Sequence, residues 1–236
     1  MFSSIKTFLK RCLYKHSLAA SQAGQDFWVY AEAFNEKKGG YFLDIGAHDG
    51  LTLSNTYILE SRYSWSGICV EANPITYKSL KKNRRSTCLN ICLDREAGTV
   101  DFTLRSVMGG IVDEDVDNNT AKAKKRGEVI QLPTFRLDSV LEKQQAPKVI
   151  DYLSIDVEGA EERILADFDF NQYTFRCITI ERPSEKLRNI LQNNGYCLVR
   201  ELQGLDCYYV HRDFFEDYSR NQLLFYRKKY LSVRWR

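Results

Sequence analysis

The sequence predicts an α/β fold in which helices cover both faces of a mostly parallel sheet. Short apolar runs alternate with helix-like segments, acidic residues follow several of these runs, and two strand-like segments close the pattern. Only four prolines and 13 glycines occur among 236 residues, which argues against disorder or a repeat architecture. We therefore expect one domain with a single core.

The elements are predicted in chain order from apolar runs and helix-end residues. Buried strands are expected at 41–45, 66–70, 88–92, 149–155 and 175–180. A helix is expected over 51–60, and another begins at Asn73-Pro74 because Asn suits the N-cap and Pro the first helical position. A third runs from Ser184 to Gly195, a C-terminal glycine. Strands at 196–199 and 207–210 form the final pair, joined through Gly204.

The two ends of the chain differ in charge from the body. Residues 1–20 carry four Lys or Arg and 219–236 carry six, with no acid in either, so the net charge of +3 leaves −7 between them. We therefore divide the chain into a basic extension at 1–20, a domain at 21–212 and a basic aromatic tail at 213–236. The basic ends suit peripheral contact with anionic lipid, and a solvated charged end is the alternative.

No run of about 18–20 apolar residues occurs, and lysines interrupt the N-terminal apolar residues, which disfavours a membrane span or a cleaved secretory signal. Seven scattered cysteines without a CxxC pair indicate reduced core thiols rather than disulfides or a metal cluster. These features predict a cytoplasmic protein, peripheral to the inner face of a membrane if its basic ends bind lipid. Between residues 107 and 128 the apolar pattern stops, and we expect a loop that acts as a lid over the substrate.

Acidic residues lie at the ends of three of the predicted strands, where open α/β sheets bind their ligands. Asp44 precedes a turn containing Gly46 and Gly50, and this spacing differs from the GxGxxG of dinucleotide-binding proteins. An acid beside glycines suits a cationic amino acid, such as the methionine part of S-adenosylmethionine; a simple strand-turn-helix corner is the alternative. Glu71 is placed to bind both hydroxyls of a ribose, or else to stabilise the helix that follows it.

The third acidic strand end carries two carboxylates, Asp156 and Glu158. Crowded carboxylates repel one another unless a proton, a cation or a polar ligand separates them. Glu162 is better explained as a residue that complements the dipole of the next helix. Asp156 and Glu158 are therefore candidate catalytic residues.

Five motifs resemble the FkbM-type methyltransferase family, in the family's order from about Ser21 to Val210. They are Ser21-Gln22-Ala23-Gly24-Gln25-Asp26, Phe42 to Gly50, Ser54-Asn55-Thr56, Val70 to Pro74, and Asp151 to Glu161. The resemblance implies a Rossmann-like class I methyltransferase fold with a mostly parallel seven-stranded sheet and a C-terminal hairpin. It also implies S-adenosylmethionine as methyl donor and O-methylation, often of sugars in glycans or lipids.

The resemblance also assigns residues to the cofactor. Asp44, Gly46, Ala47 and Gly50 would hold the methionine portion and Glu71 the ribose, while Asp94 would approach the adenine. Asn55 and Asn73 complete the predicted cofactor-binding set. Asp156 and Glu158 would face the methyl group.

Transfer of a methyl group to a hydroxyl needs a base that draws off the hydroxyl proton. Asp156 or Glu158 is the predicted base, with His48 and His211 as alternates. A divalent cation held by Asp156 and Glu158 is a further option, although no full ligand set is visible.

Two other functions remain open: a nicotinamide-dependent oxidoreductase on a related sheet, and an inactive binding domain with a methyltransferase-like fold. A nucleic-acid methyltransferase is disfavoured, because Asp156-Val157-Glu158-Gly159 lacks the Pro-Pro-aromatic stretch that grips a flipped base and the body is acidic. The expected acceptor is a small molecule or a glycan. The sequence does not predict the oligomeric state.

Overall fold

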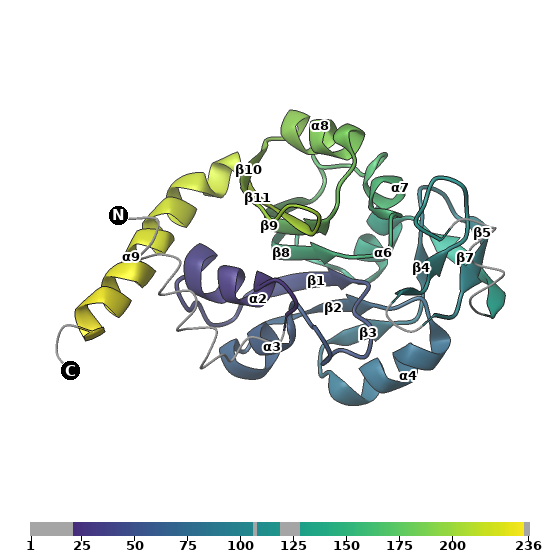
Figure 1. The fold of residues 1–236 in the computed structure, drawn as a ribbon, viewed down its shortest axis with the longest axis horizontal. Helices are drawn as coiled ribbons and strands as arrows, with labels where there is room; N and C mark the ends of the chain where they lie inside the picture. The colour runs from purple at the N-terminus through teal and green to yellow at the C-terminus, as the bar shows by residue number, and fades with distance from the viewer. Residues whose placement is uncertain (1–20, 106–107, 119–127, 234–236) are drawn as a thin grey trace.

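The computed structural model describes residues 21–105, 108–118 and 128–233. Seven strands form the main sheet in the order β10-β11-β9-β8-β1-β2-β3 (Figure 1). Their bounds are β1 Tyr41–Ile45, β2 Ser66–Val70, β3 Thr87–Leu89, β8 Val149–Ile155, β9 Thr174–Glu181, β10 Tyr196–Glu201 and β11 Asp206–His211. The first five in chain order are parallel, and β11 pairs antiparallel with β9 and β10. This order confirms the predicted Rossmann-like methyltransferase sheet with its C-terminal hairpin.

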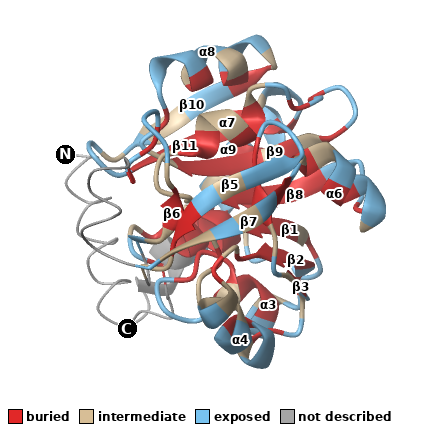
Figure 2. Ribbon diagram, turned by 90° about the vertical axis from the view of Figure 1, so that its right-hand side faces the viewer, coloured by how far each residue is buried: buried red, intermediate tan, exposed pale blue. Residues whose placement is uncertain are grey.

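The strands divide their side chains between two cores because successive residues point to opposite faces. Phe42 packs with α3, α4 and the π-helix η1, whereas Leu43 packs with α6, α7 and α8. Both side chains are fully buried, and β1, β2 and β8 are buried at every position after their first residue (Figure 2). The helices are α2 Gln25–Phe27, η1 Trp28–Ala33, α3 Tyr57–Tyr63, α4 Pro74–Asn83, α6 Leu137–Lys143, α7 Glu161–Leu165, α8 Glu185–Asn193, the 3₁₀ helix η3 Arg212–Phe214 and α9 Phe215–Val233.

The predicted helix ends are partly confirmed. The Asn73 side chain accepts a 2.9 Å hydrogen bond from the Ile75 amide, so Asn73 is the N-cap of α4. Gly195 has a φ of +85° after α8, as expected of a C-terminal glycine. The helix predicted over 51–60 was wrong at its start, because Asp49 binds the amides of Leu51 and Thr52 in a local turn and α3 begins only at Tyr57.

A second sheet of four strands, in the order β4-β7-β5-β6, lies beside the main sheet. Its strands are β4 Cys92–Leu93, β5 Gly98–Thr103, β6 Gly110–Ile111 and β7 Val129–Phe135. The single strand predicted at 88–92 is therefore wrong: the chain leaves the main sheet after Leu89 and enters the second one at Cys92. The Asn90 side chain holds this crossing by donating to the carbonyl oxygens of Glu71 and Ala72.

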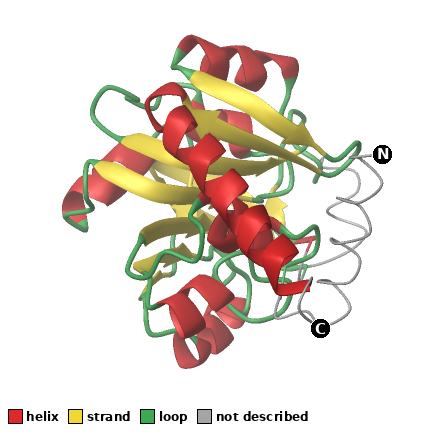
Figure 3. Ribbon diagram, turned by 90° about the vertical axis from the view of Figure 1, so that its left-hand side faces the viewer, coloured by secondary structure: helices red, strands yellow, loops and turns green. Residues whose placement is uncertain are grey.

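The described part of the predicted tail, from Asp213 to Val233, consists largely of the long helix α9, which packs against η1. Figure 3 shows α9 running across one end of the molecule. It lies at the end of the molecule opposite the second sheet (Figure 1). Glu32 of η1 is fully buried and accepts hydrogen bonds from Gln222 and Tyr226 of α9, and from Arg200 at 2.5 Å. Phe225 of α9 is buried in the same core cluster as the residues of η1.

Several predictions concern features that the fold tests only in part. Among the described residues, no helix is both long and apolar enough to cross a membrane. The described cysteines are free thiols, and all but Cys197 are buried, as expected of core thiols. Residues 1–20 and much of the predicted lid lie outside the described residues. Membrane contact through the basic ends stays a prediction.

Candidate active site

The ends of β1 and β8 are in direct backbone contact. The Asp156 amide donates to the Ile45 carbonyl oxygen at 3.1 Å. Gly46 has a φ of +85°, and a Cβ atom at this position would lie 1.9 Å from the Asp156 carbonyl oxygen. Only glycine fits such a close approach. The glycine at position 46 is therefore required by the close approach of the Asp156 backbone.

Two cavities meet at these strand ends. The first, of about 70 Å³ and called the apolar cavity below, is lined mostly by apolar residues of the β2, β4 and α7 regions, the 109–111 segment and Phe102. The second, of about 730 Å³, is polar and extends toward the N-terminal segment and β9. Their walls have four residues in common: Gly46, His48, Asp156 and Glu158. Three of these are the predicted catalytic residues.

Glu71 lies at the wall of the apolar cavity, and its carboxylate is fixed by two backbone amides. Oε2 accepts from His48 at 2.8 Å and Oε1 from Asn73 at 2.7 Å. Burial raises the pKa of Glu71 to about 7, although both amides favour its charged form. Each oxygen keeps a further lone pair for a ligand hydroxyl. The predicted ribose contact is therefore chemically available.

Asp44 is buried in an internal ion-pair network. It accepts a 2.5 Å hydrogen bond from the Thr56 hydroxyl, and Arg84 Nη1 lies 3.8 Å from its Oδ2. Burial raises the pKa of Asp44, while the charge of Arg84 acts in the opposite direction. Arg84 also pairs with Glu60 at 3.2 Å. The sequence did not indicate this arginine, which lies in a polar stretch with no motif.

Asn55 and Ala47 line the polar cavity together with Asp44. The Asn55 amide nitrogen donates to the Ser154 hydroxyl at 2.8 Å, but its buried carbonyl oxygen has no hydrogen-bond partner among the described residues. A buried acceptor without a partner is costly and indicates a missing donor. A ligand ammonium or hydroxyl group would supply that donor.

Three residues of the predicted cofactor set lie outside the walls of both cavities. Asn73 caps α4, and Gly50 leaves room for Arg84, whose Cγ would lie 2.6 Å from a Cβ at that position. Asp94 is held by Arg163 through two hydrogen bonds of 2.9 and 2.7 Å. Its neighbour Leu93, and not Asp94 itself, lines the apolar cavity.

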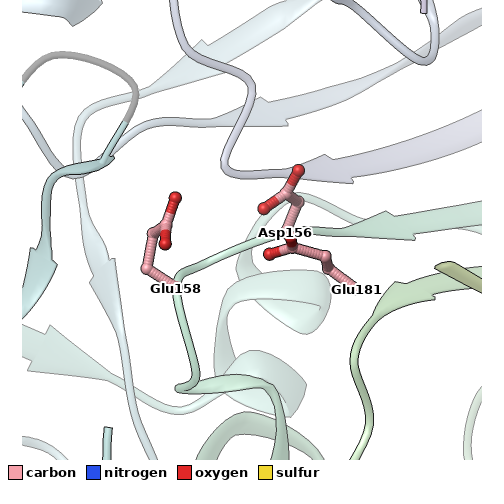
Figure 4. A group of neighbouring side chains, drawn as sticks. All are labelled: Asp156, Glu158 and Glu181. Atoms are coloured by element: carbon pink, nitrogen blue, oxygen red, sulfur yellow. The ribbon is translucent and has the colours of Figure 1, made fainter. Parts of the chain in front are cut away.

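The predicted catalytic pair belongs to a larger acidic cluster. Asp156 and Glu158 follow β8, and the Glu181 side chain extends from the end of β9 toward Asp156 (Figure 4). One carboxylate oxygen from each of the three lies within 4.8 Å of the others. Burial and the charges of Glu181 and neighbouring acids raise the pKa of Asp156 to about 8. The pKa of Glu158 is also raised, mainly by burial.

Glu181 and the arginine beside it, Arg182, were not among the predicted site residues. Glu181 follows the same rule that indicated the other acids, because it ends a buried strand of the sheet. Arg182 Nη2 lies 3.0 Å from Glu181, 3.8 Å from Glu158 and 2.8 Å from Asp117. A nearby carboxylate set of this kind can hold a divalent cation, but a fixed guanidinium already compensates part of its charge.

The two candidate histidines are placed differently. His48 lines both cavities, and its Nδ1 lies 3.6 Å from Asp49 Oδ1. His211 ends β11, where its side chain accepts a hydrogen bond from the Asp213 amide and caps η3. His211 lines neither cavity, so His48 is the better placed of the two.

Comparison with known proteins agrees with the motifs. The methyltransferase FkbM domain matches residues 44–198. No curated protein matches the chain with significant similarity. Among solved structures, the chain is similar to a TehB-like SAM-dependent methyltransferase from Corynebacterium glutamicum, at 12% identity over 89% of this chain and 98% of that one, with a TM-score of 0.42. A human methyltransferase 10 domain containing protein is similar at 11% identity over 79% and 80% of the two chains, with a TM-score of 0.42.

The family match runs from the acid of the first strand into β10 and covers more than half of the chain. It includes Asp44, Glu71, Asp156 and Glu158, and it leaves the first of the five motifs, residues 21–26, outside. The chain therefore belongs to the FkbM methyltransferase family.

Proposed function

We propose that the chain is an S-adenosylmethionine-dependent O-methyltransferase that acts on a hydroxyl group of a sugar-like acceptor. The observation that carries this proposal is the meeting of an apolar and a polar cavity at Asp156 and Glu158. The residues that line the apolar cavity suit the adenine and ribose of a nucleoside by their chemistry, those of the polar cavity suit a polyol, and acidic groups lie between the two.

The described residues fit the donor at each of its parts. The apolar cavity offers Leu93 and Phe102 to an adenine ring, and Glu71 offers both carboxylate oxygens to a ribose. The unpartnered carbonyl oxygen of Asn55, beside Asp44 in the polar cavity, suits the ammonium group of the methionine part. When bound, S-adenosylmethionine supplies a methyl group on a positively charged sulfur.

The protein's part in the reaction is to position the acceptor and take its proton. A hydroxyl held at the wall common to both cavities would lie next to Asp156 and Glu158. Either carboxylate could accept its proton as the hydroxyl oxygen takes the methyl group and the bond from that methyl carbon to sulfur breaks, which would leave S-adenosylhomocysteine as the other product. A placed base of this kind accelerates a reaction by about 10²–10⁴-fold. His48 at the same wall is the alternate base.

The lining of the polar cavity supports a neutral, hydroxyl-rich acceptor. Amide side chains from Gln22, Gln25 and Asn118 accompany the acids, and both donate and accept hydrogen bonds as sugar hydroxyls do. An acidic wall repels phosphate, which disfavours nucleic acid. A sugar within a glycan or glycolipid fits these requirements.

Two measurements test the proposal. Calorimetry should detect binding of S-adenosylhomocysteine and none of NAD, which separates a methyltransferase from an oxidoreductase. Incubation with S-adenosylmethionine and a glycan panel should then give a product heavier by one methyl group. Binding without transfer to any acceptor would instead indicate an inactive binding domain.

The matched variants are Asp156→Asn and, as control, Asp101→Asn, which changes an exposed aspartate on β5. Asp156→Asn should abolish transfer while the protein still folds and binds S-adenosylhomocysteine. Full activity in that variant would remove Asp156 from the mechanism.

A further inference from the structure

The turn that carries Asp156 and Glu158 is packed tightly against the described segment 108–118. The Asp117 amide donates to the Glu158 carbonyl oxygen at 3.1 Å. Gly159 has a φ of +96°, and a Cβ atom there would lie 2.9 Å from the Asp117 nitrogen and 3.3 Å from Val116 Cα. Glu158 itself has a φ of +56°, which is uncommon for a residue with a side chain. The contact therefore depends on a glycine and a strained neighbour.

The same segment forms walls of both cavities. Its first residues, from Gly109 to Ile111, line the apolar cavity, and Val116 to Asn118 line the polar one. Gly110 also lies close to the turn, since a Cβ atom there would be 3.4 Å from Glu158 Cβ. The position of segment 108–118 thus determines the shape of the space around Glu158.

Arg182 links this segment to the acidic cluster. Its Nη2 atom lies within 4.0 Å of carboxylates from three separate elements: Asp117 on the segment, Glu158 on the turn and Glu181 at the end of β9. The Arg182 backbone is fixed by its amide, which donates to the Leu205 carbonyl oxygen at 2.8 Å. The side chain is 45% exposed, so each pair alone contributes little to stability. Its contribution is geometric, because one guanidinium fixes three carboxylates relative to one another.

We propose that Arg182 is a positioning residue for methyl transfer, which fastens segment 108–118 onto the acidic turn and thereby shapes the acceptor side of the site. This inference rests on the proposed function. Arg182 lines the polar cavity and not the apolar one, whose wall includes Glu71. The part of the segment that lines the apolar cavity is held separately, because Gly110 and Ile111 pair with Thr103 and Phe102 of β5. Loss of Arg182 should therefore affect the acceptor and the chemical step but not binding of the nucleoside.

The test compares Arg182→Met and Arg182→Lys with Arg188→Met. Arg188 is the matched control because it pairs with Glu201 outside both cavities. Arg182→Met should lower kcat/KM for the acceptor by up to about 100-fold, as expected when a reacting group is misplaced by about 1 Å. Arg182→Lys should recover part of this loss, since it keeps the charge without the planar fork. Affinity for S-adenosylhomocysteine should stay within about twofold of wild type in all three.

Hydrogen exchange gives a readout that does not depend on turnover. In Arg182→Met the amides of residues 113–118 should exchange several times faster than in wild type, whereas Arg188→Met should leave them unchanged. Gly159→Ala should have the same effect by a separate route, because its Cβ would collide with the Asp117 nitrogen.

The outcomes separate this inference from the proposed function. If wild type transfers no methyl group to any acceptor, the proposed function fails, and the exchange experiment still decides whether Arg182 holds the segment. Unchanged exchange in Arg182→Met, or wild-type kcat/KM in that variant, would overturn the inference. Loss of nucleoside binding in a folded Arg182→Met protein would also overturn it, because the effect would then not be confined to the acceptor side.

Discussion

The backbone amide of His48 and the carboxylate of Glu71 are joined by a hydrogen bond of 2.8 Å, which ties the loop after β1 to the end of β2. The Asn73 amide binds the other oxygen at 2.7 Å. Two fixed donors therefore orient the carboxylate before any ligand arrives. Such preorganisation increases affinity because less freedom is lost on binding.

Glu71→Gln should weaken binding of S-adenosylhomocysteine about tenfold or more. The amide can no longer accept from both backbone donors, and hydrogen bonds to a charged group contribute about 1.5–3 kcal/mol each. Calorimetry measures the change, and Glu142→Gln, at an exposed position on α6, is the control. Equal affinity in Glu71→Gln and wild type would place the ribose elsewhere.

Arg84→Met should destabilise the fold far more than Arg85→Met. The Arg84 side chain is fully buried between Glu60 and Asp44, whereas that of Arg85 is 77% exposed. Removing one partner of a buried ion pair leaves an uncompensated charge and typically costs about 3–5 kcal/mol. Urea unfolding followed by circular dichroism gives both values. A loss below about 1 kcal/mol for Arg84→Met would show that Asp44 needs no cationic partner.

Stability should fall as the pH rises from about 4 to about 7. Burial raises the pKa of Glu71 and Glu161 to about 7 and that of Asp206 to about 6. In the unfolded chain these groups lose their protons near pH 4, so between the two pKa values only the folded state keeps them protonated, and this contribution to stability is lost as the pH passes the folded value. The thermal midpoint across this range checks the sign. Glu161→Gln should flatten the profile, and a midpoint that rises with pH would contradict the assignment.

Methyl transfer should survive treatment with EDTA. The three oxygens of Asp156, Glu158 and Glu181 could hold a cation, but Arg182 already places a positive charge beside Glu158 and Glu181. The rate before and after chelation, with Mg²⁺ added back, is the measurement. Activity lost to EDTA and restored by Mg²⁺ would make the acidic cluster a metal centre.

The main sheet could be predicted from the sequence because its central strands are buried on both faces and read as continuous apolar runs. The second sheet could not. Its strands β5 and β7 are partly exposed (Figure 2), and Pro133 interrupts the apolar pattern of β7. The run at 88–92 shows the same limit, since it does not reveal that the chain changes sheets at Asn90.

Site residues could be predicted where an acid ends a strand. They could not be predicted where a basic partner of such an acid lies far away in the sequence. Asp44, Glu71 and Asp156 follow from the strand-end rule, and Glu181 would have followed from it as well. Arg84 and Arg182 meet their partners only in the folded chain, because Arg84 is 40 positions from Asp44 and Arg182 is 65 from Asp117. At these separations, no motif in the sequence indicates which acid each arginine will pair with.

The contact of Gly46 with the Asp156 carbonyl oxygen limits how a protein of this architecture could diversify. Where Gly46 meets Asp156, backbone lies directly against backbone and leaves no room for a side chain at position 46. A residue that recognises a different acceptor therefore cannot be introduced at this position. Substitutions that alter acceptor recognition would have to lie in the other walls of the polar cavity. These walls are formed by the N-terminal segment at Gln22 and Gln25, the segment 108–118 and the end of β9. Exchanging these three segments between relatives, while Gly46 and Asp156 are kept, is a direct way to alter which acceptor the protein recognises.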